Sequence, residues 1–133
     1  ELRPGVYVFG DAQQWELGTC TPDDIALTAR ATVVSLAGGR MVLDAGSKVL
    51  GADRASYASG FGRLLHRPEA RIVSLAEHHA VVEPGPGRRP RLGDQVDVVP
   101  NHVCAAVNLA SELWVEEAGG LRPWPVTARG LNA

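Results

Sequence analysis

The sequence is poor in cysteine, in lysine and in aromatic residues, and each shortage narrows what the protein can be. Its 133 residues contain 2 cysteines, too few for the disulfide framework of a small secreted domain. We therefore expect Cys20 and Cys104 to be reduced, as in a cytoplasmic protein, with a disulfide between them as the alternative. Lys48 is the only lysine among 13 lysine and arginine residues, and with abundant alanine and glycine this bias suggests a high-GC bacterial genome.

Long apolar runs and a strong net charge are also missing. No stretch approaches the roughly 20 apolar residues that a membrane span needs, and the first residues do not form a signal-peptide pattern. The formal net charge is -2, and the basic run Arg88, Arg89 and Arg91 is interrupted by a proline. We therefore expect neither a membrane nor a nucleic acid as a partner.

Length and composition are those of a globular domain with a hydrophobic core. Hydrophobic residues make up 45% of the chain and charged residues 21%. The sequence starts at Glu1 without a methionine and continues directly into a strand-like segment. We therefore expect residues 1–133 to be one β-domain cut, by design or by proteolysis, from the C-terminal part of a longer chain.

Short β-branched runs separated by Gly, Pro, Asp and Asn dominate the chain, a pattern typical of all-β proteins. The predicted strands cover residues 6–9, 25–36, 41–43, 72–82, 95–99, 113–117 and 122–127. Gly38-Gly39 and Gly119-Gly120 predict hairpin turns, and Pro100 should end its strand. Residues 103–109 form either a short helix or an irregular crossing, and residues 52–68 a loop with a helical turn. The predicted fold class is mainly all-β, a compact barrel or a sandwich.

The segment Pro100-Asn101-His102-Val103-Cys104 carries the clearest chemical signal. In an extended backbone His102 and Cys104 would leave the same face, about 6–7 Å apart, where an imidazole and a thiolate can share a Zn²⁺ ion. Two ligands make an incomplete site, which implies further ligands or a catalytic metal with open positions. The structural alternative is a capped turn with a buried thiol. Asn101 either orients the histidine or is a turn residue.

Three further groups are weaker candidates. In Glu77-His78-His79 a strand would direct the two histidines to opposite faces, so only His78 is retained as a possible active-site residue. Asp44 and Lys48, which flank Gly46 after a predicted strand, either form a capped turn or lie near a substrate carboxylate or a domain interface. The three tryptophans, Trp15, Trp114 and Trp124, are expected in packing contacts.

Taken in order, these motifs closely resemble the C-terminal part of the D-serine dehydratase-like family, relatives of the fold-type III pyridoxal phosphate enzymes that include alanine racemase and D-threonine aldolase. The resemblance covers essentially the whole chain. Its most specific element is the Pro-Asn-His-x-Cys segment. The other matching segments are Arg3-Pro4-Gly5-x-Tyr7-x-Phe9-x-Asp11, Ala31-Thr32-Val33-Val34-Ser35, Asp44-Ala45-Gly46-Ser47-Lys48, Glu77-His78, Gly93-Asp94-x-Val96, Val107-Asn108-Leu109 and Trp124-Pro125-Val126-x-Ala128-Arg129-Gly130.

The resemblance implies a fold like the C-terminal β-domain of alanine racemase-type enzymes and a homodimeric enzyme that acts on a small D-amino acid. Pyridoxal phosphate would be held by a lysine of an N-terminal (β/α)₈ barrel that is absent here, so this chain alone should be inactive. His102 and Cys104 would be the metal ligands and act in catalysis through the metal. Cysteine at 104 favours Zn²⁺, with another divalent metal as the alternative. Tyr7 would lie near the cofactor phosphate.

The implied reaction is a β-elimination of water that gives a keto acid and ammonia, as in D-serine dehydratase. One alternative is retro-aldol cleavage of the D-threonine aldolase type. Another is a stand-alone, non-catalytic domain that binds metal or a partner, and a third is a structural domain without a metal. The sequence leaves the substrate and the remaining metal ligands undetermined.

Overall fold

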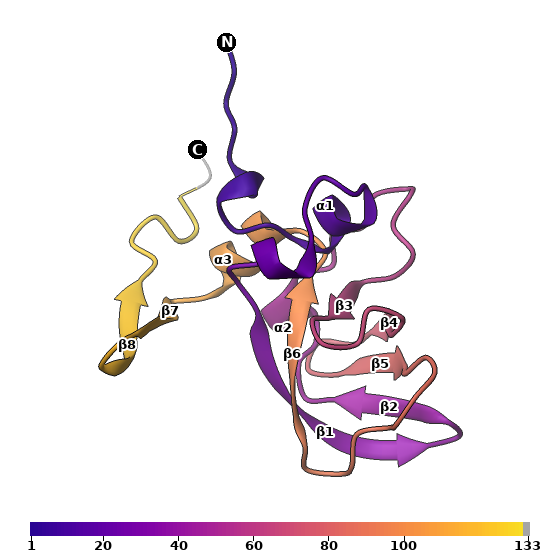
Figure 1. Ribbon diagram of the computed structural model, residues 1–133. Coiled ribbons are helices and arrows are strands. Elements are labelled where there is room, and N and C mark those ends of the chain that lie inside the picture. Colours follow the sequence, from indigo (N-terminus) through magenta and orange to yellow (C-terminus); the bar gives the residue numbers. More distant parts are fainter. Residues whose placement is uncertain (132–133) are drawn as a thin grey trace.

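The computed structural model describes residues 1–131, and its main feature is a strongly curved antiparallel sheet (Figure 1). Six strands lie in the order β3-β6-β1-β2-β5-β4, and β7 and β8 form a separate two-stranded sheet. The elements are η1 (Val6–Val8), α1 (Ala12–Glu16), η2 (Pro22–Asp24), β1 (Ala29–Ala37), β2 (Arg40–Leu43), α2 (Ser47–Leu50), β3 (Gly62–Leu64), β4 (Arg71–Leu75), β5 (Ala80–Glu83), β6 (Gln95–Pro100), α3 (Val103–Leu109), β7 (Glu112–Glu117) and β8 (Gly120–Pro125).

The six-stranded sheet is nearly closed into a barrel. Its two outer strands, β3 and β4, are joined where the Phe61 amide donates to the Ile72 carbonyl at 2.8 Å. Gly60 permits this approach, because an added Cβ would lie 2.6 Å from the same carbonyl oxygen. The mainly all-β fold class is therefore confirmed, and the barrel is the architecture observed.

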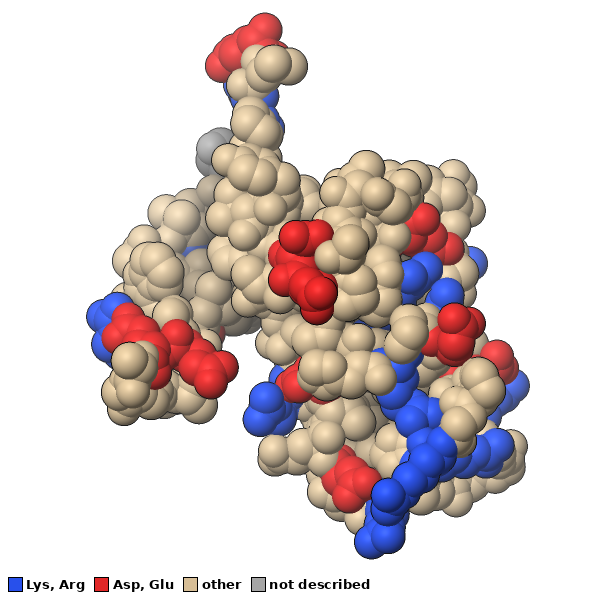
Figure 2. All heavy atoms as spheres, in the orientation of Figure 1, with Lys and Arg blue, Asp and Glu red and all other residues tan. Residues whose placement is uncertain are grey.

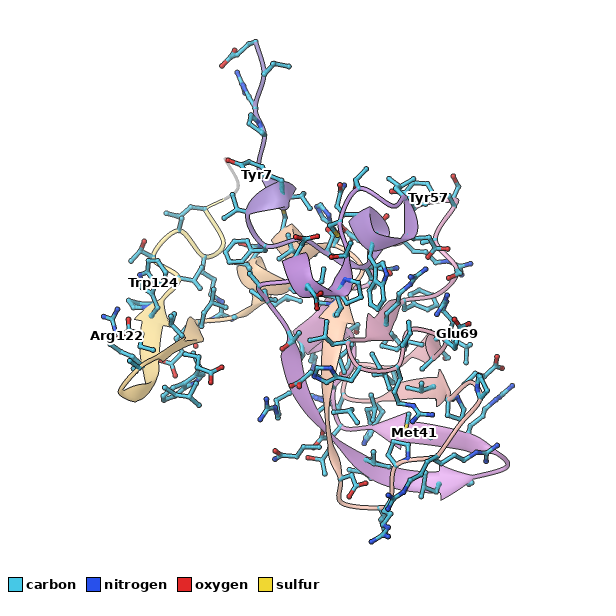
Figure 3. The ribbon with its side chains drawn as sticks, in the orientation of Figure 1. Tyr7, Met41, Tyr57, Glu69, Arg122 and Trp124 are labelled. Carbon is cyan, nitrogen blue, oxygen red and sulfur yellow. The ribbon has the colours of Figure 1, made fainter. Side chains whose placement is uncertain are left out.

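Alternation along the strands places the core inside this barrel. In β1, Ala31 and Val33 are buried, whereas Arg30 and Val34 are exposed. The other strands contribute in the same way, and the contiguous core consists of Ala31, Val33, Met41, Leu43, Ala45, Leu50, Leu64, Ala70, Ile72, Ala80, Val82 and Val98. Met41, labelled in Figure 3, marks this interior. No core residue comes from the β7–β8 hairpin, which lies apart from the barrel in Figure 1.

The predicted hairpin turns are confirmed. Gly38 and Gly39 have φ values of 59° and 78°, the left-handed conformations that a tight turn between β1 and β2 requires. Ala118 and Gly119 connect β7 with β8, Gly120 is the first residue of β8, and Pro100 is the last residue of β6. Residues 103–109 form a helix, which resolves that alternative.

Four predicted elements differ from the observed ones. Residues 6–9 form the 3-10 helix η1 instead of a strand, because the Phe9 amide bonds locally to the Val6 carbonyl. The strand predicted over residues 25–36 begins only at Ala29. The apolar run 72–82 is two strands, β4 and β5, closed by a hydrogen bond from the Ala76 amide to the His79 carbonyl. Within the predicted loop 52–68, residues 62–64 form β3.

One end of the barrel collects α1, α3 and the segments before them, while the N-terminal residues extend away from it (Figure 1). Lys and Arg side chains gather toward the lower right of the molecule in Figure 2, and acidic side chains are more scattered. No helix in residues 1–131 combines the length and hydropathy needed to cross a membrane.

Candidate functional site

The candidate site lies at the end of the barrel where α1 meets α3, and Asp11 is its centre. Asp11 is 1% exposed and is the N-cap of α1, where its Oδ1 accepts the Gln14 amide at 2.8 Å. Its other oxygen, Oδ2, accepts the Val103 amide at 3.3 Å. The Asp11 carboxylate therefore caps α1 and also accepts the first amide of α3, although the two helices are far apart in the sequence.

His102 is the N-cap residue of α3 and lies directly beside this carboxylate. Its Nδ1 is 3.5 Å from Asp11 Oδ2, and its side chain is 33% exposed. Together they line an open hollow of about 520 Å³, whose other walls are Val6, Gln13, Gln14, Asp53, Arg54, Ala55 and Tyr57. A histidine with one nitrogen against a buried carboxylate and partial access to a hollow can bind a metal or accept a proton.

Cys104 follows His102 by two residues but is presented differently. The extended backbone assumed for this pair is wrong: His102 has extended dihedral angles, whereas Cys104 lies in the first turn of α3. Cys104 is exposed and lines a second, more apolar hollow of about 330 Å³ with Phe9 and Val107. A buried thiol, the structural alternative for Cys104, is therefore not observed.

Both cysteines are free thiols, so the alternative of a disulfide between Cys20 and Cys104 is not observed. Cys20 is partly buried, and its Sγ lies 3.9 Å from the Asp11 carbonyl oxygen. Burial raises the pKa of the Cys20 thiol, and the nearby carboxylates Asp24 and Asp11 also raise it. Cys104 is therefore the more accessible of the two thiols.

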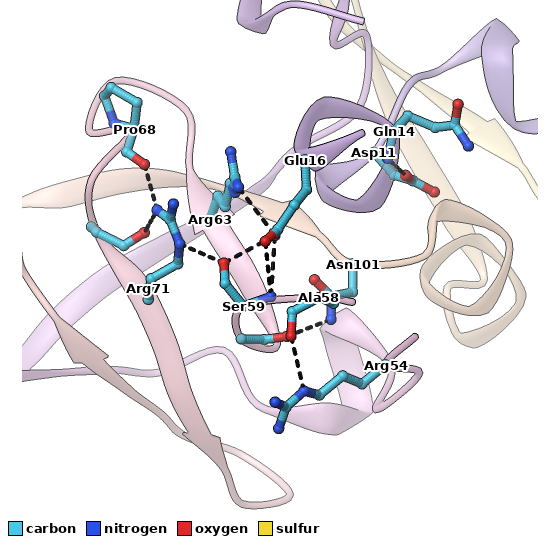
Figure 4. Close-up of polar contacts among 12 residues, drawn as sticks. Asp11, Gln14, Glu16, Arg54, Ala58, Ser59, Arg63, Pro68, Arg71 and Asn101 are labelled. Carbon is cyan, nitrogen blue, oxygen red and sulfur yellow. Dashed lines mark hydrogen bonds and ion pairs between the residues drawn. The ribbon is translucent and has the colours of Figure 1, made fainter. Parts of the chain in front are cut away.

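Asn101 holds the rim of the first hollow in place. Its buried side-chain amide donates to the Gly60 carbonyl at 2.7 Å and to the Asp53 carbonyl at 3.2 Å. Its own carbonyl accepts the Gln13 side-chain amide at 3.0 Å. These contacts fix the segment before β3 against the start of α3, as Figure 4 shows for Asn101. Asn101 is thus a structural anchor of this loop.

His78 lies elsewhere, in the turn between β4 and β5. This turn packs against the start of α2, where the Ser47 amide donates to the Ala76 carbonyl at 2.9 Å. Glu77 Oε2 lies 2.9 Å from Lys48 Nζ and 3.9 Å from His78 Nε2, and all three side chains are exposed. The placement of His78 and His79 on a strand is therefore wrong, and His78 does not line the hollow beside His102.

Asp44 and Tyr7 complete the predicted positions. The Asp44 carboxylate accepts the Thr32 amide at 2.7 Å, so it stabilises the irregular end of the β1–β2 pair. Tyr7 is 73% exposed on η1, above the barrel in Figure 3. Trp15 packs on Arg63, as expected, whereas Trp114 and Trp124 are 60% and 61% exposed, so they are not in the core and their packing at an interface stays a prediction.

A polar network beside the site was not predicted. Glu16, the last residue of α1, accepts the Ser59 amide and hydroxyl at 3.1 and 2.9 Å and pairs with Arg63 at 3.0 Å (Figure 4). Burial raises the pKa of Glu16, but the Ser59 hydrogen bonds and the Arg63 charge outweigh it, so the pKa is lowered overall. Neither Glu16 nor the N-cap role of Asp11 was predicted from the sequence, because the Glu16 partners come from a distant segment and no helix was predicted after Asp11.

The donor chemistry of the site fits part of a zinc site. His102 has its Nδ1 against a carboxylate and Cys104 offers an exposed thiol, and imidazole and thiolate are donors that zinc prefers. In residues 1–131 no three His, Cys, Asp or Glu residues are grouped to hold a metal ion. A metal held by His102 and Cys104 would therefore need ligands beyond these two residues.

Comparison with known sequences identifies the relatives of this domain. Residues 26–115 match the family model described as "Putative serine dehydratase domain". An uncharacterised protein of Mycobacterium tuberculosis is 50% identical over 132 residues, which cover 94% of this chain and 99% of that protein. D-serine dehydratase of Dictyostelium discoideum is 29% identical and D-threo-3-hydroxyaspartate dehydratase of Delftia sp. 28% identical, over 86% and 79% of this chain. The chain spans only about a third of these dehydratases, 33% and 32%.

Solved structures share the fold. D-threo-3-hydroxyaspartate dehydratase from Delftia sp. superposes with a TM-score of 0.78 and 26% identity over 91% of this chain and 37% of that one. D-threonine aldolase from Filomicrobium marinum gives a TM-score of 0.77 and 32% identity over 100% of this chain and 37% of that one. Two further structures of the dehydratase carry alanine for a histidine and for a cysteine two residues later, and the cysteine variant is in a metal-free form. The chain belongs to the serine dehydratase domain family, within the fold-type III pyridoxal phosphate enzymes that the sequence resemblance indicated.

Proposed function

We propose that this chain is the metal-bearing C-terminal domain of a pyridoxal phosphate-dependent D-amino acid lyase of the D-serine dehydratase type. The observation that carries the proposal is the His102-x-Cys104 pair at the Asp11 end of the barrel. The dehydratase variants described above support it, because they replace a histidine and a cysteine with the same spacing, and the cysteine variant is metal-free.

In this proposal His102 and Cys104 hold a divalent metal, preferably Zn²⁺. When bound, such an ion supplies Lewis-acid assistance to departure of a substrate β-hydroxyl group. The task of this chain is to present the two ligands: Asp11 fixes the start of α3, and Asn101 fixes the adjoining loop. Pyridoxal phosphate and its lysine would belong to an N-terminal barrel in a homodimer, as the family resemblance implies, and the low cysteine content favours a cytoplasmic location.

The products would be a keto acid and ammonia from a D-amino acid with a β-hydroxyl group. Tyr7 is proposed near the cofactor phosphate because it projects from the exposed N-terminal segment, where a preceding barrel would join. His78 is exposed in the β4–β5 turn, beside Glu77 and Lys48. It remains a candidate proton carrier only if the barrel covers that turn.

Two observations favour other functions. The aldolase from Filomicrobium marinum is 32% identical over the whole chain, which supports retro-aldol cleavage as the second candidate. By the family resemblance, however, aldolases have aspartate at the position of Cys104. The mycobacterial relative is almost fully covered by this domain, which supports a third candidate: a stand-alone domain that binds metal or a partner without catalysis.

The first test is the metal content of the purified chain by elemental analysis. We expect about one zinc equivalent in the wild type and a loss of most of it in His102→Ala and Cys104→Ala. Cys20→Ala is the matched control, because it removes the other thiol and should retain the metal. Equal zinc in all four proteins would place the metal elsewhere.

The second test separates the candidate reactions in a protein that joins this domain to a barrel. Release of keto acid and ammonia from D-serine or D-threo-3-hydroxyaspartate supports the dehydratase. Release of glycine from D-threonine supports the aldolase. If the zinc-loaded protein performs neither reaction, the stand-alone function is favoured.

A further inference from the structure

We propose that Asp11 is a positioning residue that sets the tautomer of His102, so that Nδ1 carries the proton and Nε2 is the nitrogen offered to a metal. This inference deepens the proposed function and rests on it for the role of Nε2. The tautomer itself is a property of this chain and can be measured without any metal.

The Asp11 carboxylate is surrounded by hydrogen-bond donors. Both oxygens of the carboxylate accept backbone N–H groups, Oδ1 from Gln14 at 2.8 Å and Oδ2 from Val103 at 3.3 Å. A carboxyl group that accepts at both oxygens has its lone pairs directed at donors. The surface that Asp11 presents to His102 is therefore an acceptor.

The nitrogen of His102 that lies beside this carboxylate is Nδ1. His102 Nδ1 lies 3.5 Å from Oδ2 of Asp11, a residue that is only 1% exposed. At this distance an unprotonated Nδ1 would hold a lone pair near a carboxylate oxygen, which is repulsive, whereas a protonated Nδ1 is attracted to it. The neutral imidazole should thus be the Nδ1–H form, the minor tautomer of free histidine in water.

The other ring nitrogen, Nε2, is then free to act as a metal ligand. With the proton on Nδ1, Nε2 keeps its lone pair, and the ring is partly exposed at the edge of the 520 Å³ hollow. Metal-binding histidines commonly donate the opposite N–H to a carboxylate, which fixes the ring and strengthens the ligand. Asp11 also holds the Val103 amide, so the same carboxylate fixes the backbone that carries the ring.

The test is a long-range proton–nitrogen NMR spectrum of the metal-free, ¹⁵N-labelled full chain about two pH units above the ordinary histidine pKa of about 6.5. We expect a protonated Nδ1 and an unprotonated Nε2 for His102, assigned among the 4 histidines with a His102→Gln variant. Asp11→Asn should reverse the pattern, since an amide N–H₂ in place of Oδ2 can face Nδ1 while the amide oxygen keeps the α1 cap; the Val103 amide then loses its acceptor.

Asp11→Ser is a second variant that keeps the test valid if Asp11→Asn does not fold. Serine is a good N-cap, so α1 should persist, but it presents no carboxylate to His102 and should shift the tautomer toward Nε2–H. Asp24→Ser is the matched control: this exposed aspartate completes the capping box of Thr21 at η2, does not line the hollow beside His102, and should leave the His102 signals unchanged.

The second readout is Co²⁺ affinity, followed by the visible absorption of the bound ion. Loss of the positioning carboxylate should weaken binding by about 10–100-fold in Asp11→Asn, whereas Asp24→Ser should bind like the wild type. A wild-type His102 with the proton on Nε2, or a tautomer unchanged in both Asp11 variants, would overturn the inference. If the tautomer shifts as expected but the wild type binds neither zinc nor cobalt, the metal proposal fails and the tautomer assignment stands.

Discussion

At the scale of the residue, the most informative group after Asp11 is Glu16. Its carboxylate lies between the Ser59 amide, the Ser59 hydroxyl and the Arg63 guanidinium, which also packs on the Trp15 ring at 4.9 Å. A carboxyl group whose pKa is lowered in the folded state stabilises that state above its unfolded pKa, and the benefit disappears as the pH falls through the lowered folded value. The network therefore ties α1 to β3 in a pH-dependent way.

Glu16→Gln tests this dependence. We expect the variant to lose about 1–2 kcal/mol of unfolding free energy at neutral pH, since hydrogen bonds to a charged group are removed and the site is not fully buried. The difference from the wild type should shrink as the pH falls below the unfolded value of about 4.5. Urea unfolding at several pH values measures it, with Glu116→Gln on the exposed hairpin as control. A pH-independent difference would contradict the linkage.

At the scale of the element, the contact between α2 and the β4–β5 turn depends on a single glycine. A Cβ at Gly46 would lie 2.5 Å from the Glu77 carbonyl oxygen, a distance that real Cβ contacts do not reach. The two segments are joined by backbone hydrogen bonds, including one from the Lys48 amide to the Glu77 carbonyl at 3.1 Å. Only glycine allows the two backbones to come this close.

Gly46→Ala should therefore separate α2 from the turn and cost about 2–3 kcal/mol of unfolding free energy. Urea unfolding gives the total, and hydrogen exchange should show faster exchange at the Ser47 and Lys48 amides than elsewhere in the barrel. Gly119→Ala is the control, because its added Cβ meets nothing within 4 Å. Equal stability of the two variants would show that the turn can move without cost.

The elements that could be predicted from the sequence are those with local signals. Strands such as β6 and the turns at Gly38-Gly39 and Gly119-Gly120 show alternation or glycine pairs, and both are present in the structure. The 3-10 helix η1 resembles a strand in sequence, and only the absence of a pairing partner among the described residues distinguishes it.

The candidate site was predictable only in part. The donor chemistry of the candidate ligands His102 and Cys104 was visible in the motif, but their geometry was not, because α3 begins between them. The capping of α3 by Asp11 joins residues that are 92 positions apart, so no local pattern reveals it.

At the scale of the whole molecule, the chain consists of a barrel with its own core and a hairpin that stands apart from it. The β7–β8 sheet pairs only with itself among the described strands, and its exposed apolar side chains include Trp114, Leu121 and Trp124. Leu113 lies opposite Trp124 and Trp114 opposite Pro123, so the two tryptophans occupy opposite faces of the hairpin. Such surface is typical of a contact with another protein part.

Removal of residues 111–133 should accordingly leave the barrel folded. The truncation removes none of the core residues. It does remove the hydrogen bond that the Gly130 amide donates to the Asn108 side chain. We expect a β-type circular dichroism spectrum, cooperative unfolding and a Tm lower by about 4–8 °C, which corresponds to about 1 kcal/mol in a domain of this size. The exposed hairpin surface should also promote self-association of the full chain, so association measured by sedimentation at rising concentration should be weaker in the truncated chain.

A double variant of the full chain, Trp114→Ser with Trp124→Ser, separates the two effects. It keeps the hairpin backbone and removes both exposed rings, so it should reduce self-association as far as the truncation does and leave the Tm of the barrel unchanged. If the truncated chain unfolds, the removed residues stabilise the barrel, and the segment after β8 is the candidate, because Val126 and Ala128 line the second hollow together with Val107 of α3. If the truncated chain and the double variant both still self-associate, the contact surface lies on the barrel. The second hollow, beside Cys104, is then the surface to probe.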